Sequence, residues 1–436
     1  MLKRHGWQIL ALVAVLNSSV AIAQQPPARP EQVAEPGGQL PGNPSLGLTK
    51  IVEGLVDPIN LTHAGDGSGR LFVVERAGRI RIVTRDGELR TEPFLDLTRH
   101  RPSVINPSGN VVQSGFIEQG LYSVAFHPNF RRNGLFFVHF ASLEQNGAGV
   151  VLRFKVDPRN PDLVSPLRAR ETEKLVLKVE QPSYNNNGGQ IAFGPDGYLY
   201  AGFGDGGWKA PENVSQDMSS RLGKILRIDV DTDEPFSVPD DNPFLKDGTS
   251  TRSEIWAIGL HNPYKFSFDR LTGNLFVADV GDSSWEEINF IPASSKGGHN
   301  FGWPVMEGKN CYNPTGKKLS DCQTIGQLPT AQYAHPEKGK TSGALNCASV
   351  QGLGVANYGQ MKGVYLVGDW CSGVISGLGW NGNSWQLQKL LETPLNITAG
   401  GLDEDGRVMV LSAKFYSDDP DPKKPPFGTL WRLDPK

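Results

Sequence analysis

Net charge and long apolar runs are both scarce in this chain of 436 residues. Its 43 basic and 46 acidic side chains leave a formal charge of −3, so the sequence lacks the basic surface of a nucleic-acid-binding protein and the charge excess of a disordered one. Only five methionines are present, and runs rich in Ala, Glu and Lys are few, which argues against a helical bundle or a coiled coil. The near-neutral charge is consistent with a neutral partner such as a small sugar.

The most pronounced apolar stretch lies near the N-terminus, at residues 7–16, behind the basic start of Lys3 and Arg4. It is too short to span a bilayer, and the small residues 21–23 resemble a signal-peptide cleavage box. We therefore predict a signal peptide at residues 1–23, a flexible leader rich in Pro, Gln and Gly at residues 24–46, and no membrane-spanning segment. The mature protein is expected to be exported, either to the periplasm or as a secreted protein.

Cysteine is also scarce, with four residues in the whole chain. None lies in a C-x-x-C pattern or at a spacing typical of haem or zinc ligands, which argues against redox or metal chemistry at these positions. An even number in an exported protein indicates structural disulfides. Cys311 and Cys322 bracket a loop rich in Pro and Gly and are expected to pair with each other, which leaves Cys347 to pair with Cys371.

Glycine and proline are plentiful, with 51 and 32 residues, and they favour many turns between short strands. A Gly-led turn followed by an alternating apolar strand recurs six times, at residues 69–73, 134–138, 197–201, 273–277, 363–367 and 406–410. A β-sandwich also contains such turns. Six copies spread over the whole chain, without a long amphipathic helix between them, instead favour an all-β fold, a six-bladed β-propeller over residues 47–436.

Four polar, Gly-rich loops between the predicted strands are candidates for a binding site. They lie at residues 118–121, 184–189, 259–263 and 279–287. Glycines allow the backbone to approach a ligand closely, but such segments also serve as plain turns. In a propeller, loops at one end of the strands converge on the central axis, so these four segments are expected to meet there.

Several segments carry a resemblance to a known family. Gly120-Leu-Tyr-Ser-Val-Ala-Phe-His-Pro-Asn-Phe130, Gly188-Gly-Gln-Ile-Ala-Phe-Gly-Pro-Asp-Gly197 and Gly259-Leu-His-Asn-Pro263 resemble the soluble PQQ-dependent sugar dehydrogenases, the glucose/sorbosone dehydrogenase family. Residues 223–229, 285–289 and 298–304 resemble it as well, in the same order. The resemblance implies a six-bladed propeller, in agreement with the six repeats.

The same resemblance implies an activity, the oxidation of an aldose to a lactone with PQQ and calcium. In that family a His base takes the hydroxyl proton while hydride passes to the quinone, and an external acceptor then removes the electrons. Imidazole suits the base because its pKa lies near neutral pH. Arg side chains suit the anionic quinone, and oxygen ligands, often backbone carbonyls, suit calcium.

Carried over residue by residue, the resemblance places substitutions at the most important positions. The family's base His corresponds to Asn186, whose amide has no useful proton affinity. The Arg that would contact the quinone corresponds to His261, and a further Arg corresponds to Asn357 in a looser alignment. Losing an imidazole base costs about 10²–10⁴ in rate, so the standard mechanism would be impaired.

Other family positions are retained in this sequence. Glu118 stands at the cofactor-contacting Gln or Glu of the first loop, and Asn262 is unchanged. The calcium loop matches at Gly281 and Asp282, where backbone carbonyls would serve as ligands. The candidate catalytic residues are thus Asn186 and His261, and PQQ and calcium are the candidate cofactors.

Three functions stay open at this point. The protein is a PQQ- and calcium-dependent sugar dehydrogenase with an altered site, in which His261 supplies the missing imidazole. Alternatively, it is a non-catalytic propeller that binds a carbohydrate or a protein. A third alternative is a calcium-dependent hydrolase or lactonase that uses the same axial pocket, because propellers host several chemistries.

Overall fold

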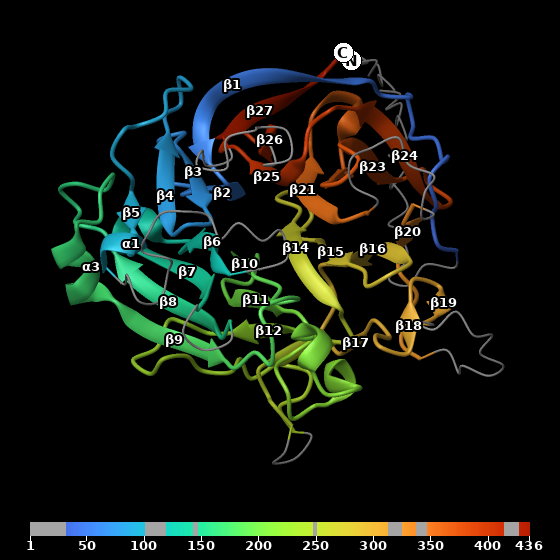
Figure 1. The fold of residues 1–436 in the computed structure, drawn as a ribbon, viewed down its shortest axis with the longest axis horizontal. Helices are drawn as coiled ribbons and strands as arrows, with labels where there is room; N and C mark the ends of the chain where they lie inside the picture. The colour runs from blue at the N-terminus through green and yellow to red at the C-terminus, as the bar shows by residue number, and fades with distance from the viewer. Residues whose placement is uncertain are drawn as a thin grey trace, which may run out of the picture.

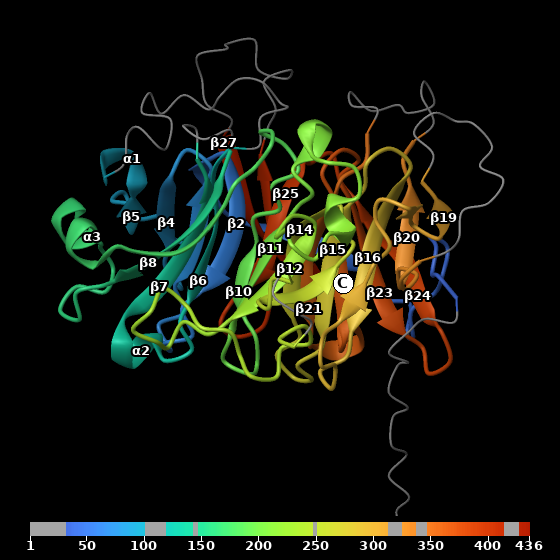
Figure 2. The same cartoon turned by 90° about the horizontal axis from the view of Figure 1, so that it is seen from below.

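The computed structural model is a ring of six β-sheets around a central axis (Figure 1). Figure 2 shows the same ring from the side, with the strands of neighbouring blades tilted across one another. The structure describes residues 32–100, 119–142, 147–246, 251–312, 325–336, 347–413 and 427–436. This arrangement confirms the predicted six-bladed propeller.

Each of the first three blades has antiparallel strands that follow one another from the axis outwards. These strands are β2 (Pro58–His63), β3 (Leu71–Glu75), β4 (Arg79–Val83) and β5 (Leu95–Asp96); β6 (Gly120–Phe126), β7 (Leu135–Ala141), β8 (Gly149–Lys155) and β9 (Lys174–Val179); and β10 (Ile191–Phe193), β11 (Leu199–Phe203), β12 (Lys224–Ile228) and β13 (Ile255–Ile258). A fifth strand, β17 (His299–Asn300), adds to β13 in parallel.

The remaining blades follow the same plan, with a closing strand in the last. Their strands are β14 (Asn262–Phe268), β15 (Leu275–Val280), β16 (Trp285–Ile291) and β20 (Ala331–Ala334); β21 (Val350–Ala356), β22 (Val364–Asp369), β23 (Val374–Trp380) and β24 (Trp385–Glu392); and β25 (Ile397–Leu402), β26 (Val408–Ala413), β27 (Phe427–Pro435) and β1 (Leu46–Val56).

The connections contain one small hairpin and a few short helices. They are β18 (Met306–Glu307) with β19 (Asn310–Cys311), α1 (Leu97–His100), α2 (Phe130–Asn133), α3 (Pro166–Thr172), and the 3-10 turns η1 (Gly207–Lys209), η2 (Val214–Gln216) and η3 (Gly359–Met361). No helix in the described ranges is both long and apolar enough to cross a membrane.

The six sequence repeats correspond to one structural position. The strand of each repeat is the second strand of its blade, namely β3, β7, β11, β15, β22 and β26. The leading glycine of every repeat has a positive φ, between 67° and 85°. The turn from the first to the second strand requires this left-handed backbone, which glycine adopts without steric cost, and the repeat is visible in the sequence for that reason.

The ring is closed by the N-terminal strand of the described chain. β1 pairs antiparallel with β27 from Leu46–Pro435 to Val56–Phe427, so the last blade is built from both ends of the sequence. The backbone N–H of Lys436 also donates to the carbonyl of Ser45 at 2.8 Å. This pairing holds the first and last blades together.

Part of the predicted flexible leader is ordered instead. Within residues 32–45, Ala34 bridges to Ala331, and Pro36 bridges to Leu387. The Leu40 side chain is buried, and its backbone N–H donates to the Gln388 side chain at 2.7 Å. The prediction of a loose leader up to residue 46 is therefore wrong for these residues, because apolar and backbone contacts tie them to the outer strands. Residues 1–31, with the predicted signal peptide, lie outside the described residues.

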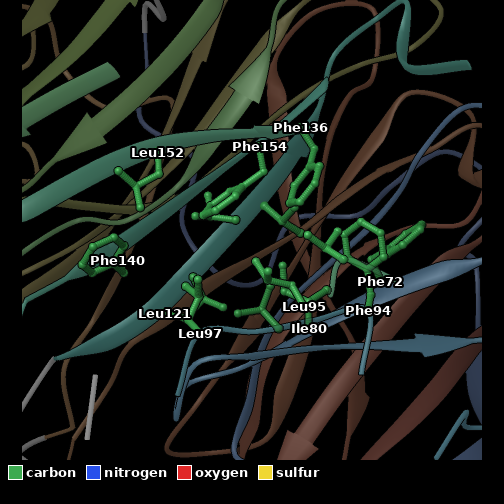
Figure 3. Packing of buried hydrophobic residues seen from close by; sticks show 14 of the residues in the cluster. Phe72, Ile80, Phe94, Leu95, Leu97, Leu121, Phe136, Phe140, Leu152 and Phe154 are labelled. Atoms are coloured by element: carbon green, nitrogen blue, oxygen red, sulfur yellow. The ribbon is translucent and has the colours of Figure 1, made fainter. Parts of the chain in front are cut away.

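The core lies between neighbouring blades, where the sheets pack face to face. Figure 3 shows part of the cluster between the first two blades, in which Phe72, Phe94 and Phe136 approach one another. Their ring centres are 4.9 Å apart for Phe72 and Phe94 and 5.0 Å apart for Phe94 and Phe136. All three side chains are fully buried, so these aromatic contacts fix the spacing of the blades.

One predicted disulfide is present. Cys347 and Cys371 are bonded, and they join the segment before β21 to the turn after β22. Cys311 is also disulfide-bonded, and the expected partner Cys322 lies outside the described residues.

Truncating a side chain between the blades should weaken the whole fold. Phe136→Ala removes a fully buried ring and is expected to lower the free energy of unfolding by about 3–5 kcal/mol. The control is Leu271→Ala, because Leu271 is 63% exposed and its change should stay within about 0.5 kcal/mol. Denaturant titration followed by tryptophan fluorescence measures both. Equal effects of the two substitutions would contradict the inter-blade core.

Candidate functional site

Several predicted site residues meet at one end of the propeller axis. Asn186 lies in the loop before β10, His261 and Asn262 lie at the start of β14, and Gly281 follows β15. The Asn186 Nδ2 atom is 2.9 Å from the His261 Nε2 atom. The loops of blades three and four therefore converge here, as expected from the sequence.

Glycines allow the loop of Asn186 to lie close to its neighbours. A side chain at Gly204 would place its Cβ 2.1 Å from the Asn186 carbonyl oxygen, and one at Gly188 would lie 2.6 Å from the Gly202 carbonyl oxygen. Asn186 itself has a φ of 53°, in the left-handed region that Asn tolerates better than most residues. The backbone of this loop therefore favours Asn and Gly at these positions, whether or not a ligand binds there.

Asp205 is the third member of this contact. Its Oδ1 atom accepts a hydrogen bond from the Asn186 Nδ2 at 3.1 Å, and its Oδ2 atom accepts one from the Trp303 Nε1 at 2.9 Å. The Trp303 ring also packs edge-on against the His261 ring, with centres 4.5 Å apart. Asp205 and Trp303 were not predicted as site residues, and neither lies in one of the four loop segments.

His261 is buried among acidic groups. Burial alone would lower the pKa of His261, but attraction to Asp205, Asp279 and Asp282 outweighs this effect and raises the pKa to about 9. Its Nδ1 atom lies 2.5 Å from the Val280 carbonyl oxygen, and only 5% of the residue is exposed. The raised pKa favours the imidazolium form of His261, which cannot act as a general base, while burial raises the pKa of the neighbouring Asp279 carboxyl to about 7.

The Asn186 amide is oriented by Asp205 and by the His261 ring. Its Nδ2 atom donates to Asp205 Oδ1 at 3.1 Å and lies 2.9 Å from His261 Nε2. This contact suits a ring that carries its proton on Nδ1 and accepts at Nε2. An imidazolium would donate from Nε2, and an amide oxygen turned toward it would also face the Asp205 carboxylate. Asn186 has no proton affinity of its own.

Asn262 joins the two loops. Its side-chain oxygen accepts a hydrogen bond from the backbone N–H of Gly188 at 2.8 Å, and its own backbone N–H donates to the Asp279 carboxylate at 2.6 Å. The backbone N–H of His261 donates to the same carboxylate at 3.0 Å. Asp279 is only 3% exposed, and its two hydrogen bonds hold the backbone at the start of β14 in place.

The predicted calcium loop is arranged around a carboxylate. The Oε1 atom of Glu307 accepts from four consecutive backbone N–H groups, those of residues 282–285, at 2.8–3.3 Å. Asp282 lies beside His261, with 3.9 Å between its Oδ1 and the His261 Nε2, and its Oδ2 accepts from the Tyr312 hydroxyl at 2.7 Å. Glu307 shapes this loop and was not predicted.

An axial pocket of about 150 Å³ lies beside these loops. Its walls combine aromatic rings with amide and hydroxyl groups, and they are Ile59, Arg76, Tyr122, Asn262, Tyr264, Val280, Ser349, Gln351, Trp370 and Thr398. The Arg76 guanidinium forms an ion pair with Asp57 at 2.9 Å. None of the four large side chains was predicted as a site residue: Arg76 and Trp370 directly follow the second strands β3 and β22, and Tyr122 and Tyr264 lie in the inner strands β6 and β14.

One predicted site residue does not join this group. Asn357 lies just after the end of β21, at the opposite end of the inner strands, where its amide donates to Asp269 at 2.7 Å. At the start of β21, Ser349 and Gln351 line the axial pocket. Glu118 lies outside the described residues.

Comparison with known proteins agrees with the fold. Residues 55–394 match the family described as Glucose / Sorbosone dehydrogenase, which is well over half of the chain. The chain belongs to the glucose/sorbosone dehydrogenase family. In fold, the chain is similar to the PQQ-bound form of aldose sugar dehydrogenase from Streptomyces coelicolor, at 23% identity and a TM-score of 0.63, with 91% of this chain and all of the other covered.

Two curated relatives of this glucose/sorbosone dehydrogenase family member have other names. Hedgehog-interacting protein of Mus musculus is 36% identical over 239 residues, 52% of this chain and 32% of the relative. HIPL1 protein of Arabidopsis thaliana is 31% identical over 346 residues, 68% of this chain and 48% of the relative. The chain spans about a third to a half of the length of these relatives.

The described residues supply only part of what PQQ and calcium would require. No group of three or more His, Cys, Asp or Glu side chains suited to a metal ion is found in the described part of the chain; the predicted calcium ligands are backbone carbonyls, and the Val280 carbonyl lies at hydrogen-bonding distance from His261. A buried imidazolium beside Asp205, Asp279 and Asp282 supplies positive charge where a cation would otherwise be needed. The position of the family's base holds an amide.

The raised pKa of His261 predicts a specific pH dependence of stability. Because the pKa rises from 6.5 in the unfolded chain to about 9 in the folded one, this residue stabilises the fold fully below about pH 6.5, and its contribution is lost as pH rises through 9. The full contribution is on the order of 3 kcal/mol. His261→Gln should remove it.

Denaturant titrations of both proteins across this pH range test the prediction. The difference in unfolding free energy between them should shrink as pH rises, because only the wild type loses the interaction. His335, whose pKa is also raised, is present in both proteins, so its titration cancels in the difference. A difference that stays constant with pH would show that His261 is not charged.

Proposed function

We propose that this protein is an exported propeller that binds a neutral sugar unit in the axial pocket and does not oxidise it by the family's base-assisted quinone route. The observation that carries this proposal is that neither residue at the family's catalytic positions is suited to accept a proton. Asn186 has no proton affinity, and the acidic neighbours of His261 raise its pKa to about 9, which favours the imidazolium form. Neither group takes a proton from a sugar hydroxyl at neutral pH.

The pocket walls support a neutral, polyhydroxylated ligand. Tyr122, Tyr264 and Trp370 offer flat apolar faces, while Gln351 and Asn262 offer amide groups. A few placed polar groups within apolar walls are typical of small-molecule sites. The charge of Arg76 is balanced by Asp57, so the ligand need not be an anion.

Export is part of the same proposal. The Cys347–Cys371 disulfide supports it, because such bonds form and persist in oxidising compartments. The predicted signal peptide at residues 1–23 would direct the chain to the periplasm or the outside.

PQQ-dependent aldose oxidation is the second candidate. It is favoured by the family match over residues 55–394 and by the structural relative from Streptomyces coelicolor, an aldose sugar dehydrogenase in its PQQ-bound form. Arg76 beside the pocket is a cation of the kind that an anionic quinone needs. This candidate requires a proton acceptor other than the two residues described above.

Sugar binding is tested by calorimetric titration with monosaccharides. We expect measurable binding of at least one aldose, and Trp370→Ala should weaken it about tenfold or more, because a flat wall of the pocket is lost. Trp208→Ala is the matched control, since this indole is 65% exposed and lies outside the pocket. Equal binding by both variants, or no binding by the wild type, would reject the sugar proposal.

Catalysis is tested separately with PQQ, calcium, an aldose and a reducible dye. The wild type is expected to show no dye reduction above background. The double variant Asn186→His with His261→Arg restores the family's residues, and a gain of about 10²-fold or more would show that the substitutions alone silenced the site. Rapid dye reduction by the wild type would instead establish the second candidate.

A further inference from the structure

A second cavity lies on the propeller axis, at the end opposite the axial pocket. It has a volume of about 700 Å³. The final residues of the inner strands contribute to its walls, among them His63 of β2, Phe126 of β6, Phe268 of β14 and Leu402 of β25. The axial pocket is lined by early residues of the same strands. The two cavities therefore open toward opposite faces of the ring, and we call this one the opposite-end cavity.

Lys265 lines the opposite-end cavity and lacks a hydrogen-bond partner. It lies in the middle of β14 and is 3% exposed, and its Nζ atom has no acceptor among the described residues. The Nζ atom is 4.4 Å from the centre of the Tyr264 ring, and Tyr264 lines the axial pocket. Lys265 thus lines the opposite-end cavity, while its amine contacts Tyr264, a residue of the axial pocket.

The charge of this amine is not balanced by nearby acidic groups. Burial, and next the positive charge of Arg76, lower the pKa of Lys265 to about 7. The carboxylate that lines the same cavity, Asp269, is already used, because it accepts from Asn357 at 2.7 Å and from Thr272 at 2.5 Å. An unpaired buried cation is costly, and an anion within hydrogen-bonding distance relieves that cost.

Other polar groups also line the cavity. The His63 Nδ1 is buried and has no hydrogen bond among the described residues, and the buried Ser267 Oγ interacts only with the Tyr365 hydroxyl there. Arg270 lies exposed at the wall, and its guanidinium donates to the backbone carbonyl of Glu404 at 3.0 Å. The available donors therefore include the basic side chains of Lys265, which is buried, and Arg270, which is exposed.

The remaining walls are apolar. They include Leu61, Val124, Phe126, Ile191, Phe193, Phe266, Phe268, Leu353 and Leu402. A volume of several hundred Å³ with mostly apolar walls and a few convergent polar groups is typical of a small-molecule site. A strongly hydrated inorganic anion would leave these walls unused.

We propose that the opposite-end cavity binds a small organic carboxylate, with its anionic group at Lys265 Nζ and its apolar body against the aromatic and aliphatic walls. This site is separate from the axial pocket and does not depend on what binds there. The carboxylate would accept from Lys265 and could also reach the Ser267 hydroxyl. Charge-assisted hydrogen bonds of this kind are the strong ones in proteins.

The proposal is tested by calorimetry on the full chain with 2-naphthoate as the probe. We expect binding of 2-naphthoate and at least tenfold weaker binding of the neutral 2-naphthamide. Lys265→Met keeps the length of the side chain and removes the charge, and it should weaken naphthoate binding at least tenfold. Lys265→Gln is a second variant in case the first does not fold, and thermal melting checks both.

Matched controls separate this site from the surface and from the axial pocket. Lys362→Met changes an exposed lysine at the turn after β21 and should leave naphthoate binding unchanged. Trp370→Ala in the axial pocket should also leave it unchanged, so failure of the sugar proposal would not affect this one. Crystals soaked with 6-bromo-2-naphthoate should show the bromine inside the opposite-end cavity. Absence of binding, equal binding of the amide, unchanged binding by folded Lys265 variants, or bromine elsewhere would overturn the proposal.

Discussion

The pairing of β1 with β27 is the interaction on which the rest of the structure depends. A propeller has one seam where the last blade meets the first, and here the seam is closed by hydrogen bonds between strands from the two ends of the sequence. Closure holds six inner strands around one axis, so the loops that precede them share a small space. Without it, Asn186 in blade three and His261 in blade four would keep their contact only through local packing.

Buried carboxylates then organise the loops at one end of that axis. Asp279 accepts from the backbone N–H groups of His261 and Asn262, and Glu307 accepts from the loop at residues 282–285. Because buried negative charge is costly without compensation, this end of the molecule favours a cation. His261 meets that need with its own ring, from within the protein. The arrangement explains why an imidazole near the catalytic position is a donor and not a base.

The sequence predicts the fold better than the site, for a physical reason. The left-handed turn before each second strand can hardly be formed by another residue, so the six glycines mark six blades. Site residues such as Arg76, Asp205 and Trp370 come from different blades and meet only when the ring closes. The loop motifs identified Asn186, His261 and Asn262 because glycines surround them. Asn357, which was suggested by a looser alignment, lies at the end of β21 that points away from the axial pocket.

Asn186 and His261 are linked through one contact. Their side chains are 2.9 Å apart, and Asp205, Asp279 and Asp282 raise the pKa of His261. A second imidazole at position 186 would face a charged His261 directly, and the like charge would lower its proton affinity. An amide avoids the conflict, because it offers either oxygen or nitrogen according to what faces it. The choice of His at position 261 thus favours an amide at position 186, which leaves no proton acceptor there.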